Sequence, residues 1–134
     1  MSFCTAVNCM DGRVQLPIIH YLMDRFGCAY VDVVTEAGPV RFMAEAPDAE
    51  VARSILRRVA VSVEKHGSSI VAVVAHWDCA GNPLPESEQR RQLRASVDLV
   101  VRSFPGVRVL GLWADEQWTV EEVHDVGPSG ARGR

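Results

Sequence analysis

The feature that most constrains this chain is a nearly unbroken apolar run from Ser69 to Ala75. After its serine, the run contains only isoleucine, valine and alanine, so a strand formed from it would carry apolar side chains on both faces. Strands of this composition are typical of parallel sheets that are covered on both sides. We therefore expect residues 69–75 to form the central strand of a sheet that lies between two layers of helices.

Strand and helix patterns alternate along the rest of the chain. Apolar clusters bounded by turn residues predict strands at residues 3–8, 29–35, 107–113 and 118–126. Apolar residues at three- and four-residue spacing predict helices at residues 16–26, from 48 to Gly67, and over 93–104. The predicted fold class is α/β: a single domain with a mostly parallel sheet of four or five strands and helices on both faces. The last strand follows a short turn at residues 114–116 and is therefore expected to be antiparallel.

The length of 134 residues suits one domain with a real hydrophobic core. We assign this domain to residues 1–126, because residues 127–134 lack apolar periodicity and are expected to form a disordered tail. The net charge is only −3 and the arginines are interleaved with acidic and apolar residues, so no nucleic-acid partner is expected. No apolar run approaches the roughly 18 residues of a membrane span, and no secretory signal is evident. We therefore expect a cytoplasmic protein without a membrane partner.

Candidate metal ligands follow two of the predicted strands. Cys9 stands just past the first strand, and His76 and Cys79 stand just past the central one. In open α/β sheets, ligands bind beyond the carboxyl ends of strands, so the three side chains would meet if these strands are neighbours. Zinc prefers cysteine and histidine ligands, and a catalytic zinc keeps one position open for water or substrate. The sequence therefore predicts a Zn²⁺ site.

An aspartate and an arginine accompany the first of these ligands. Asp11 lies two residues after Cys9, and Arg13 lies two residues further on. If Asp11 pairs with Arg13, the carboxylate stays ionised and can orient a zinc-bound water molecule. If Asp11 swings inward, it can instead occupy the fourth position of the metal. The sequence leaves both arrangements open.

The two motifs together, Cys9-x-Asp11-x-Arg13 and His76-x-x-Cys79, resemble those of the β-class carbonic anhydrases. The resemblance extends over most of the chain and, more weakly, includes residues 35–39. It implies that Cys9, His76 and Cys79 bind zinc, and that Asp11 and Arg13 form the catalytic pair that orients the attacking water. The implied reaction is the reversible hydration of carbon dioxide to bicarbonate by zinc-bound hydroxide. The implied assembly is a homodimer or a higher homo-oligomer.

Two other functions fit the same residues. The first is hydrolysis of carbonyl sulfide or carbon disulfide at the same zinc site. The second is a non-catalytic zinc-binding domain with a regulatory or assembly role, in which Asp11 closes the metal. Both possible enzymes, the carbonic anhydrase and the hydrolase of carbonyl sulfide or carbon disulfide, would act on a small-molecule substrate. The non-catalytic zinc-binding domain would need no substrate.

The remaining cysteine, histidine and tryptophan side chains are expected to be structural. Four cysteines in a reducing compartment favour free thiols or metal ligands over disulfides. Packing is the expected role for Cys4, Cys28, His20, His66, His124, Trp113 and Trp118, with an interface as the alternative for the two tryptophans. Trp77 could shape either the pocket or only the turn, and Gln15 is a minor candidate for a polar pocket group.

Overall fold

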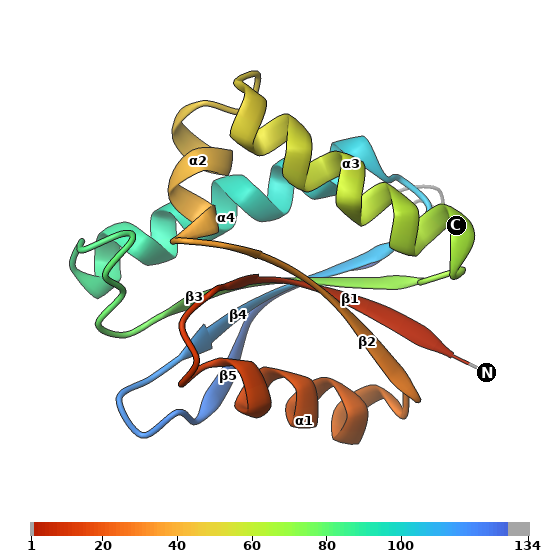
Figure 1. The fold of residues 1–134 in the computed structure, drawn as a ribbon, viewed down its shortest axis with the longest axis horizontal. Coiled ribbons are helices and arrows are strands. Elements are labelled where there is room, and N and C mark those ends of the chain that lie inside the picture. The colour runs from red at the N-terminus through yellow and green to blue at the C-terminus, as the bar shows by residue number, and fades with distance from the viewer. Residues whose placement is uncertain (1, 129–134) are drawn as a thin grey trace.

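The computed structural model describes residues 2–128 and shows a five-stranded sheet with helices on both of its faces (Figure 1). The strands are β1 (Phe3–Cys9), β2 (Tyr30–Glu36), β3 (Ile70–His76), β4 (Arg108–Ala114) and β5 (Val120–Val126). The helices are α1 (Gln15–Phe26), α2 (Pro39–Glu45), α3 (Glu50–Lys65) and α4 (Glu86–Ser103).

The sheet has the strand order β2-β1-β3-β4-β5. The first four strands in this order are parallel, and β5 runs antiparallel to β4. β1 and β3 are neighbours, with Thr5 opposite Val71 and Val7 opposite Val73. The predicted α/β fold, with its antiparallel last strand, is therefore confirmed.

The central strand is covered on both faces, as its composition predicts. Val71 and Val73 of β3 point into the core beneath α2, α3 and α4, whereas Ala72 and Val74 point toward α1. In Figure 1, α2, α3 and α4 lie above the sheet and α1 lies below it. β3 therefore carries apolar side chains in both halves of the core.

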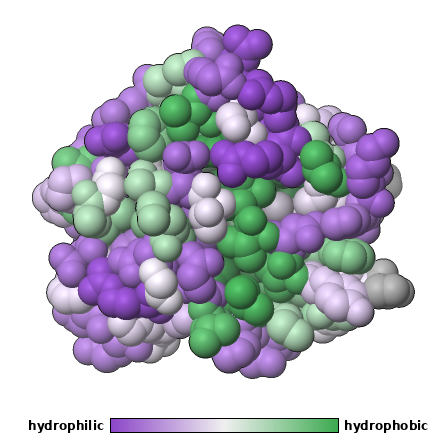
Figure 2. All heavy atoms as spheres, viewed as in Figure 1, coloured by the Kyte–Doolittle hydropathy of each residue, from purple (hydrophilic) through white to green (hydrophobic). Residues whose placement is uncertain are grey.

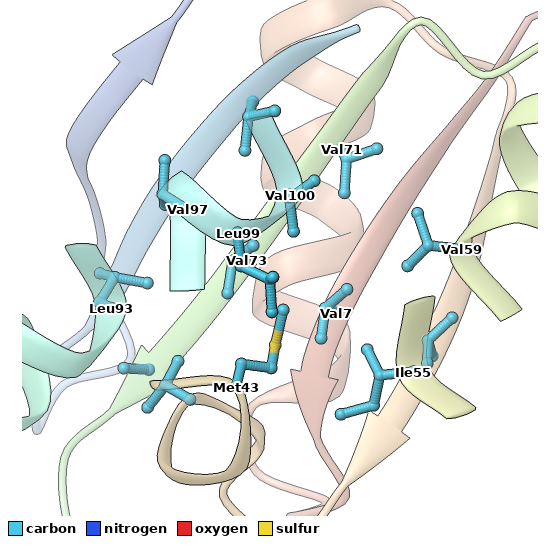
Figure 3. Close-up of a cluster of buried hydrophobic side chains, with 14 of the residues drawn as sticks. Val7, Met43, Ile55, Val59, Val71, Val73, Leu93, Val97, Leu99 and Val100 are labelled. Atoms are coloured by element: carbon cyan, nitrogen blue, oxygen red, sulfur yellow. The ribbon is translucent and has the colours of Figure 1, made fainter. Parts of the chain in front are cut away.

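The upper half of the core is the one that Figure 3 draws in detail. Met43 of α2 lies between Val7 of β1 and Val73 of β3, so this short helix packs directly over the middle of the sheet (Figure 3). The longer helices flank this centre with Ile55, Val59, Leu93, Val97 and Val100 (Figure 3). In the lower half, Ile18 and Leu22 are the fully buried residues of α1.

Two helices differ from the sequence prediction. α2 was not predicted, because its seven residues are too few for a helical period to be visible, although Pro39 at its first position is a typical helix start. α4 begins at Glu86, directly after Pro85 and ahead of the first apolar residue of its predicted stripe. Both differences lie in the connections that follow β2 and β3.

The end of the chain leaves one expectation open. Gly127 and Pro128 follow β5 without regular structure, and residues 129–134 of the predicted tail lie outside the described residues. The domain boundary at residue 126 therefore stays a prediction. Among the helices of residues 2–128, none is both long enough and apolar enough to cross a bilayer.

Candidate metal centre

The ends of β1 and β3 bring three potential metal ligands together. Cys9 is the last residue of β1, His76 is the last residue of β3, and Cys79 lies in the turn that follows. Their ligand atoms all lie within 4.8 Å of one another, and all three residues are buried. Among residues 2–128, this is the one group of three or more Cys, His, Asp or Glu side chains that could share an ion. We call it the three-donor cluster.

The imidazole of His76 is oriented for a metal. Its Nδ1 lies 2.7 Å from the carbonyl oxygen of Trp77. A carbonyl oxygen only accepts hydrogen bonds, so Nδ1 carries the proton and the lone pair of the neutral ring is on Nε2. Nε2 is buried and has no hydrogen-bond partner in the described structure. A buried nitrogen without a partner is unfavourable, and a metal ion would satisfy it.

One of the two thiols of the cluster, that of Cys9, is poised to lose its proton. The Sγ atoms of Cys9 and Cys79 are 3.8 Å apart, and neither cysteine forms a disulfide. The hydrogen bond from the Cys79 thiol lowers the pKa of Cys9 below its usual value, and the same interaction raises the pKa of Cys79. A thiolate is therefore favoured at Cys9 even without an ion, and a thiolate is the form that binds metals.

The Asp11 carboxylate is not part of the three-donor cluster. Its two oxygens accept hydrogen bonds from the Arg13 guanidinium, from Nε at 3.1 and 3.2 Å and from Nη2 at 2.7 Å. The Arg13 backbone N–H also donates to Asp11, at 2.9 Å. These hydrogen bonds lower the pKa of Asp11 to about 2, so the carboxylate is ionised at neutral pH. Of the two arrangements that the sequence allows, the structure has the one in which Asp11 pairs with Arg13.

Three further residues hold this motif in place. The side-chain Nε2 of Gln15, the first residue of α1, donates to the Cys9 carbonyl at 2.5 Å and to the Asp11 carbonyl at 3.3 Å. Arg13 also donates to the carbonyl oxygen of Asp78 at 3.1 Å, and its guanidinium carbon lies 4.9 Å from the centre of the Trp118 ring. Gln15 therefore supports the backbone of the motif and does not serve as a free polar group of the pocket.

Sequence reasoning missed the contributions of Gln15 and Trp118 to the site. Trp118 was expected to serve packing or an interface, and it does pack partly against the core below the sheet. Its contact with Arg13 joins the β4–β5 turn to the loop after β1, and no sequence pattern relates these two segments. The positive φ of Trp118, the one local anomaly there, is visible only in the structure.

A small cavity opens beside the cluster. It has a volume of about 240 Å³ and is lined by Cys9, Met10, Asp11, Ala37, Ala80 and Gly81. The loops after β2 and β3 form one side of it and approach closely, since a Cβ on Gly81 would lie 2.6 Å from the carbonyl carbon of Ala37. Space is equally limited at Gly38, which has a φ of +65°, because a Cβ added there would lie 2.7 Å from the Cβ of Asn82. This wall of the cavity is therefore made largely of backbone.

The other candidate residues lie away from the cluster. Cys4 and Cys28 are buried free thiols in the core below the sheet. His66 contacts Asp32 at the end of α3, and His124 lies on β5. Trp77, by contrast, lies beside the cluster, where its backbone carbonyl fixes the ring of His76 and its side chain is exposed.

Comparisons with known proteins agree with this architecture. Residues 1–124 match the model of a protein family described as "Putative carbonic anhydrase". No curated protein sequence matches the chain. Among solved structures, one of two tetrameric β-carbonic anhydrases from Sordaria macrospora is similar over 90% of this chain and 79% of its own, with a TM-score of 0.62 and 12% identity. The β-carbonic anhydrase CafA of Aspergillus fumigatus is similar over 96% and 78%, with a TM-score of 0.50 and 16% identity.

Proposed function

The chain belongs to the carbonic anhydrase family and has the fold of the β-class enzymes, and we propose that it catalyses the reversible hydration of carbon dioxide to bicarbonate. In this proposal Cys9, His76 and Cys79 hold a Zn²⁺ ion. The observation that carries the proposal is the three-donor cluster, in which the buried Nε2 of His76 faces two thiols with no other partner.

The donor set fits zinc in its chemistry. Two sulfur atoms and one imidazole nitrogen are ligands that zinc prefers, and three protein ligands leave one coordination position for the reaction. When bound, zinc supplies a Lewis acid that makes a water-derived nucleophile available near neutral pH. The carbonyl oxygen of Trp77 supports this arrangement, because it fixes the ring of His76 with Nε2 toward the two sulfur atoms.

Asp11 and Arg13 are the catalytic pair in this proposal. Arg13 keeps the carboxylate ionised and turned away from the three-donor cluster. An ionised carboxylate can accept a hydrogen bond from an attacking water molecule and fix its orientation. The apolar side chains of Met10, Ala37 and Ala80 suit a small apolar substrate such as carbon dioxide.

Metal analysis combined with stopped-flow hydration assays tests the proposal. We expect about one zinc per chain and hydration of carbon dioxide well above the buffer rate. Fully zinc-loaded protein that does not exceed the buffer rate would exclude this function. Release of sulfide from carbonyl sulfide without carbon dioxide hydration would indicate the sulfur substrate. A crystal structure with Asp11 bound to the metal at every accessible pH would indicate a non-catalytic zinc domain.

We also propose that the chain forms a homo-oligomer. The similar Sordaria enzymes are described as tetrameric. In this chain β2 is an edge strand, and Figure 2 shows a band of apolar atoms along the part of the surface where β2 runs in Figure 1. At the rim of the site, Met10 is 66% exposed and Trp77 is 42% exposed, which is a large exposure for apolar side chains. Light scattering after size exclusion should give a multiple of the chain mass, and the mass of a single chain would contradict the proposal.

A further inference from the structure

The Arg13 guanidinium has partners on three sides. Asp11 accepts from one edge of it, and Asp78 accepts from the other edge through its carbonyl oxygen at 3.1 Å and its carboxylate at 3.3 Å. The indole of Trp118 supplies the third contact, with its ring centre 4.9 Å from the guanidinium carbon. This distance is within the range of cation–π attraction. Arg13 is nevertheless 46% exposed, so these neighbours hold in one place a side chain that is not buried.

The backbone is unusual at two of these three partners. Asp78 has a φ of 56° and Trp118 has a φ of 61°, and they are the two non-glycine residues with positive φ in residues 2–128. This conformation is uncommon for a side chain other than glycine, and for a bulky residue such as tryptophan it is a real outlier. Both outliers touch the same arginine, although they lie 40 residues apart in different turns.

The hairpin between β4 and β5 explains how Trp118 reaches this conformation. The Asp115 carboxylate accepts hydrogen bonds from the backbone N–H groups of Gln117 and Thr119, each at 2.9 Å, and the Trp118 N–H donates to the Asp115 carbonyl. A turn of this kind ends in a residue in the left-handed region, where glycine is the usual choice. Here the chain has tryptophan instead, and the turn delivers its ring onto Arg13.

We propose that Trp118 is a positioning residue that holds Arg13 against Asp11 and thereby keeps the Asp11 carboxylate away from the three-donor cluster. This role rests on the proposed function, since it concerns the pair that orients the attacking water. A strained conformation that persists at a site is expected where the surrounding contacts require it. Asp78 completes the arrangement through its backbone carbonyl.

The competing explanation is that Trp118 only fills space. The centre of its ring lies 5.8 Å from that of the His76 imidazole and 6.5 Å from that of the Trp77 indole, and the side chain contacts the core below the sheet. A packing residue and a positioning residue make different predictions for Trp118→Gly. Glycine removes the packing but relieves the backbone strain, so only a positioning role predicts a disturbed Arg13 in a protein that remains folded.

Nuclear magnetic resonance of the arginine Nε–H groups tests the proposal directly. In the wild-type protein, we expect the Arg13 Nε–H signal to be slow to exchange and shifted by the Trp118 ring current. In Trp118→Gly and Trp118→Asn the ring-current shift of the Arg13 Nε–H should vanish, and its hydrogen exchange with water should be about tenfold faster. Trp118→Phe should retain most of the shift and most of the protection from exchange. Gln117→Gly, in the same turn, is the matched control. Arg90, which lies over Trp113 at 5.4 Å, is an internal reference in every variant.

Removal of the ring changes the chemical shift in any case, so the exchange rate decides: an unchanged exchange rate of the Arg13 Nε–H in folded Trp118→Gly would overturn the proposal. If the glycine and asparagine variants both fail to fold, Trp118 is a packing residue and the proposal is likewise wrong. Hydration kinetics give a second readout, in which Trp118→Gly should lower kcat about tenfold with little change in KM. If zinc-loaded wild-type protein is inactive, the proposed function fails, while the resonance experiment still decides whether Trp118 holds Arg13.

Discussion

Two clusters of polar side chains in this protein differ in how completely their hydrogen bonds are satisfied. Between β1, β2 and α3, the Thr5 hydroxyl donates to Ser62, which in turn donates to Asp32 and also contacts Ser68, at 2.6–2.7 Å. Asp32 also accepts from Nδ1 of His66 at 2.6 Å. In the three-donor cluster, by contrast, the sulfur atoms contact each other and Nε2 of His76 has no partner.

This contrast separates a structural network from a site. The first cluster has the serine, histidine and aspartate of a hydrolase, but Ser62 donates its proton to Asp32 and not to a histidine base. It even adjoins the larger hollow, of about 300 Å³ against 240 Å³ at the three-donor cluster. The residue types of a cluster and the size of the hollow beside it would therefore favour the Thr5–Ser62–Asp32 network as the functional site. The buried Nε2 of His76, which has no hydrogen-bond partner and lies beside two thiols, instead favours the three-donor cluster.

Removing one donor of the three-donor cluster should have the largest effect. In Cys79→Ala only two ligands remain, so we expect zinc affinity to fall more than about a hundredfold, because even the outer partners of metal ligands contribute 10- to 100-fold. Zinc content after dialysis, measured by mass spectrometry, checks this loss. The control is Cys28→Ala, a buried thiol outside the cluster, which should keep its zinc. Equal zinc content in the two variants would remove the basis for assigning the site.

Arg13→Ala should have the next largest effect, on rate and not on folding. Without its guanidinium, Asp11 loses the partner that holds it, and we expect kcat/KM for hydration to fall about a hundredfold. The melting temperature should change by less than about 3 °C, because exposed ion pairs contribute little to stability. Arg57→Ala removes an exposed ion pair with Glu50 on α3 and should leave the rate unchanged. A similar rate for both variants would mean that Arg13 has no catalytic part.

Ser62→Ala should lower the stability of the protein and leave its hydration rate unchanged, which is the reverse of the effect expected for Arg13→Ala. It leaves the fully buried Thr5 hydroxyl without its acceptor, which is expected to lower the free energy of unfolding by about 1–3 kcal/mol. Zinc content and hydration rate should remain at wild-type levels. Ser103→Ala, which removes an exposed hydroxyl bonded within α4, should change stability by less than about 0.5 kcal/mol in the same urea titration. A loss of zinc in Ser62→Ala would show that the two clusters are coupled.

The smallest expected effect is that of Asp32→Asn on how the free energy of unfolding falls at acidic pH. Burial alone would raise the pKa of Asp32, but hydrogen bonds from Ser62 and His66 outweigh burial and lower it in the folded protein. A lowered pKa contributes stability above the unfolded value of about 3.9, and this contribution is lost as the pH falls through the folded pKa. Urea titrations from pH 5 to pH 3 should therefore fall less steeply for Asp32→Asn than for wild type. Asp24→Asn, on the exposed side of α1, should follow the wild-type slope, and parallel slopes for all three would contradict this role of Asp32.

The sequence predicts the fold and the meeting of the three donors well, because both follow from strand order. The apolar run at residues 69–75 and the alternation of strands and helices are strong signals, and parallel neighbours place Cys9 beside His76. α2 is not predictable from periodicity because it is too short. The supporting contacts of Gln15 and Trp118 depend on how separate turns meet in space, and local patterns carry no information about that.

The close approach of the loops at Ala37 and Gly81, which line the cavity, has a consequence for anyone who wishes to redesign this protein. The shape of the cavity wall there is set by main-chain atoms in contact, so side-chain replacement there cannot widen or narrow the cavity without moving two loops. Freedom to alter which molecules enter is therefore concentrated at Met10 and Ala80, both exposed side chains on the cavity lining. A library that randomises those two positions and leaves Gly81 intact is the economical starting point for changing the substrate.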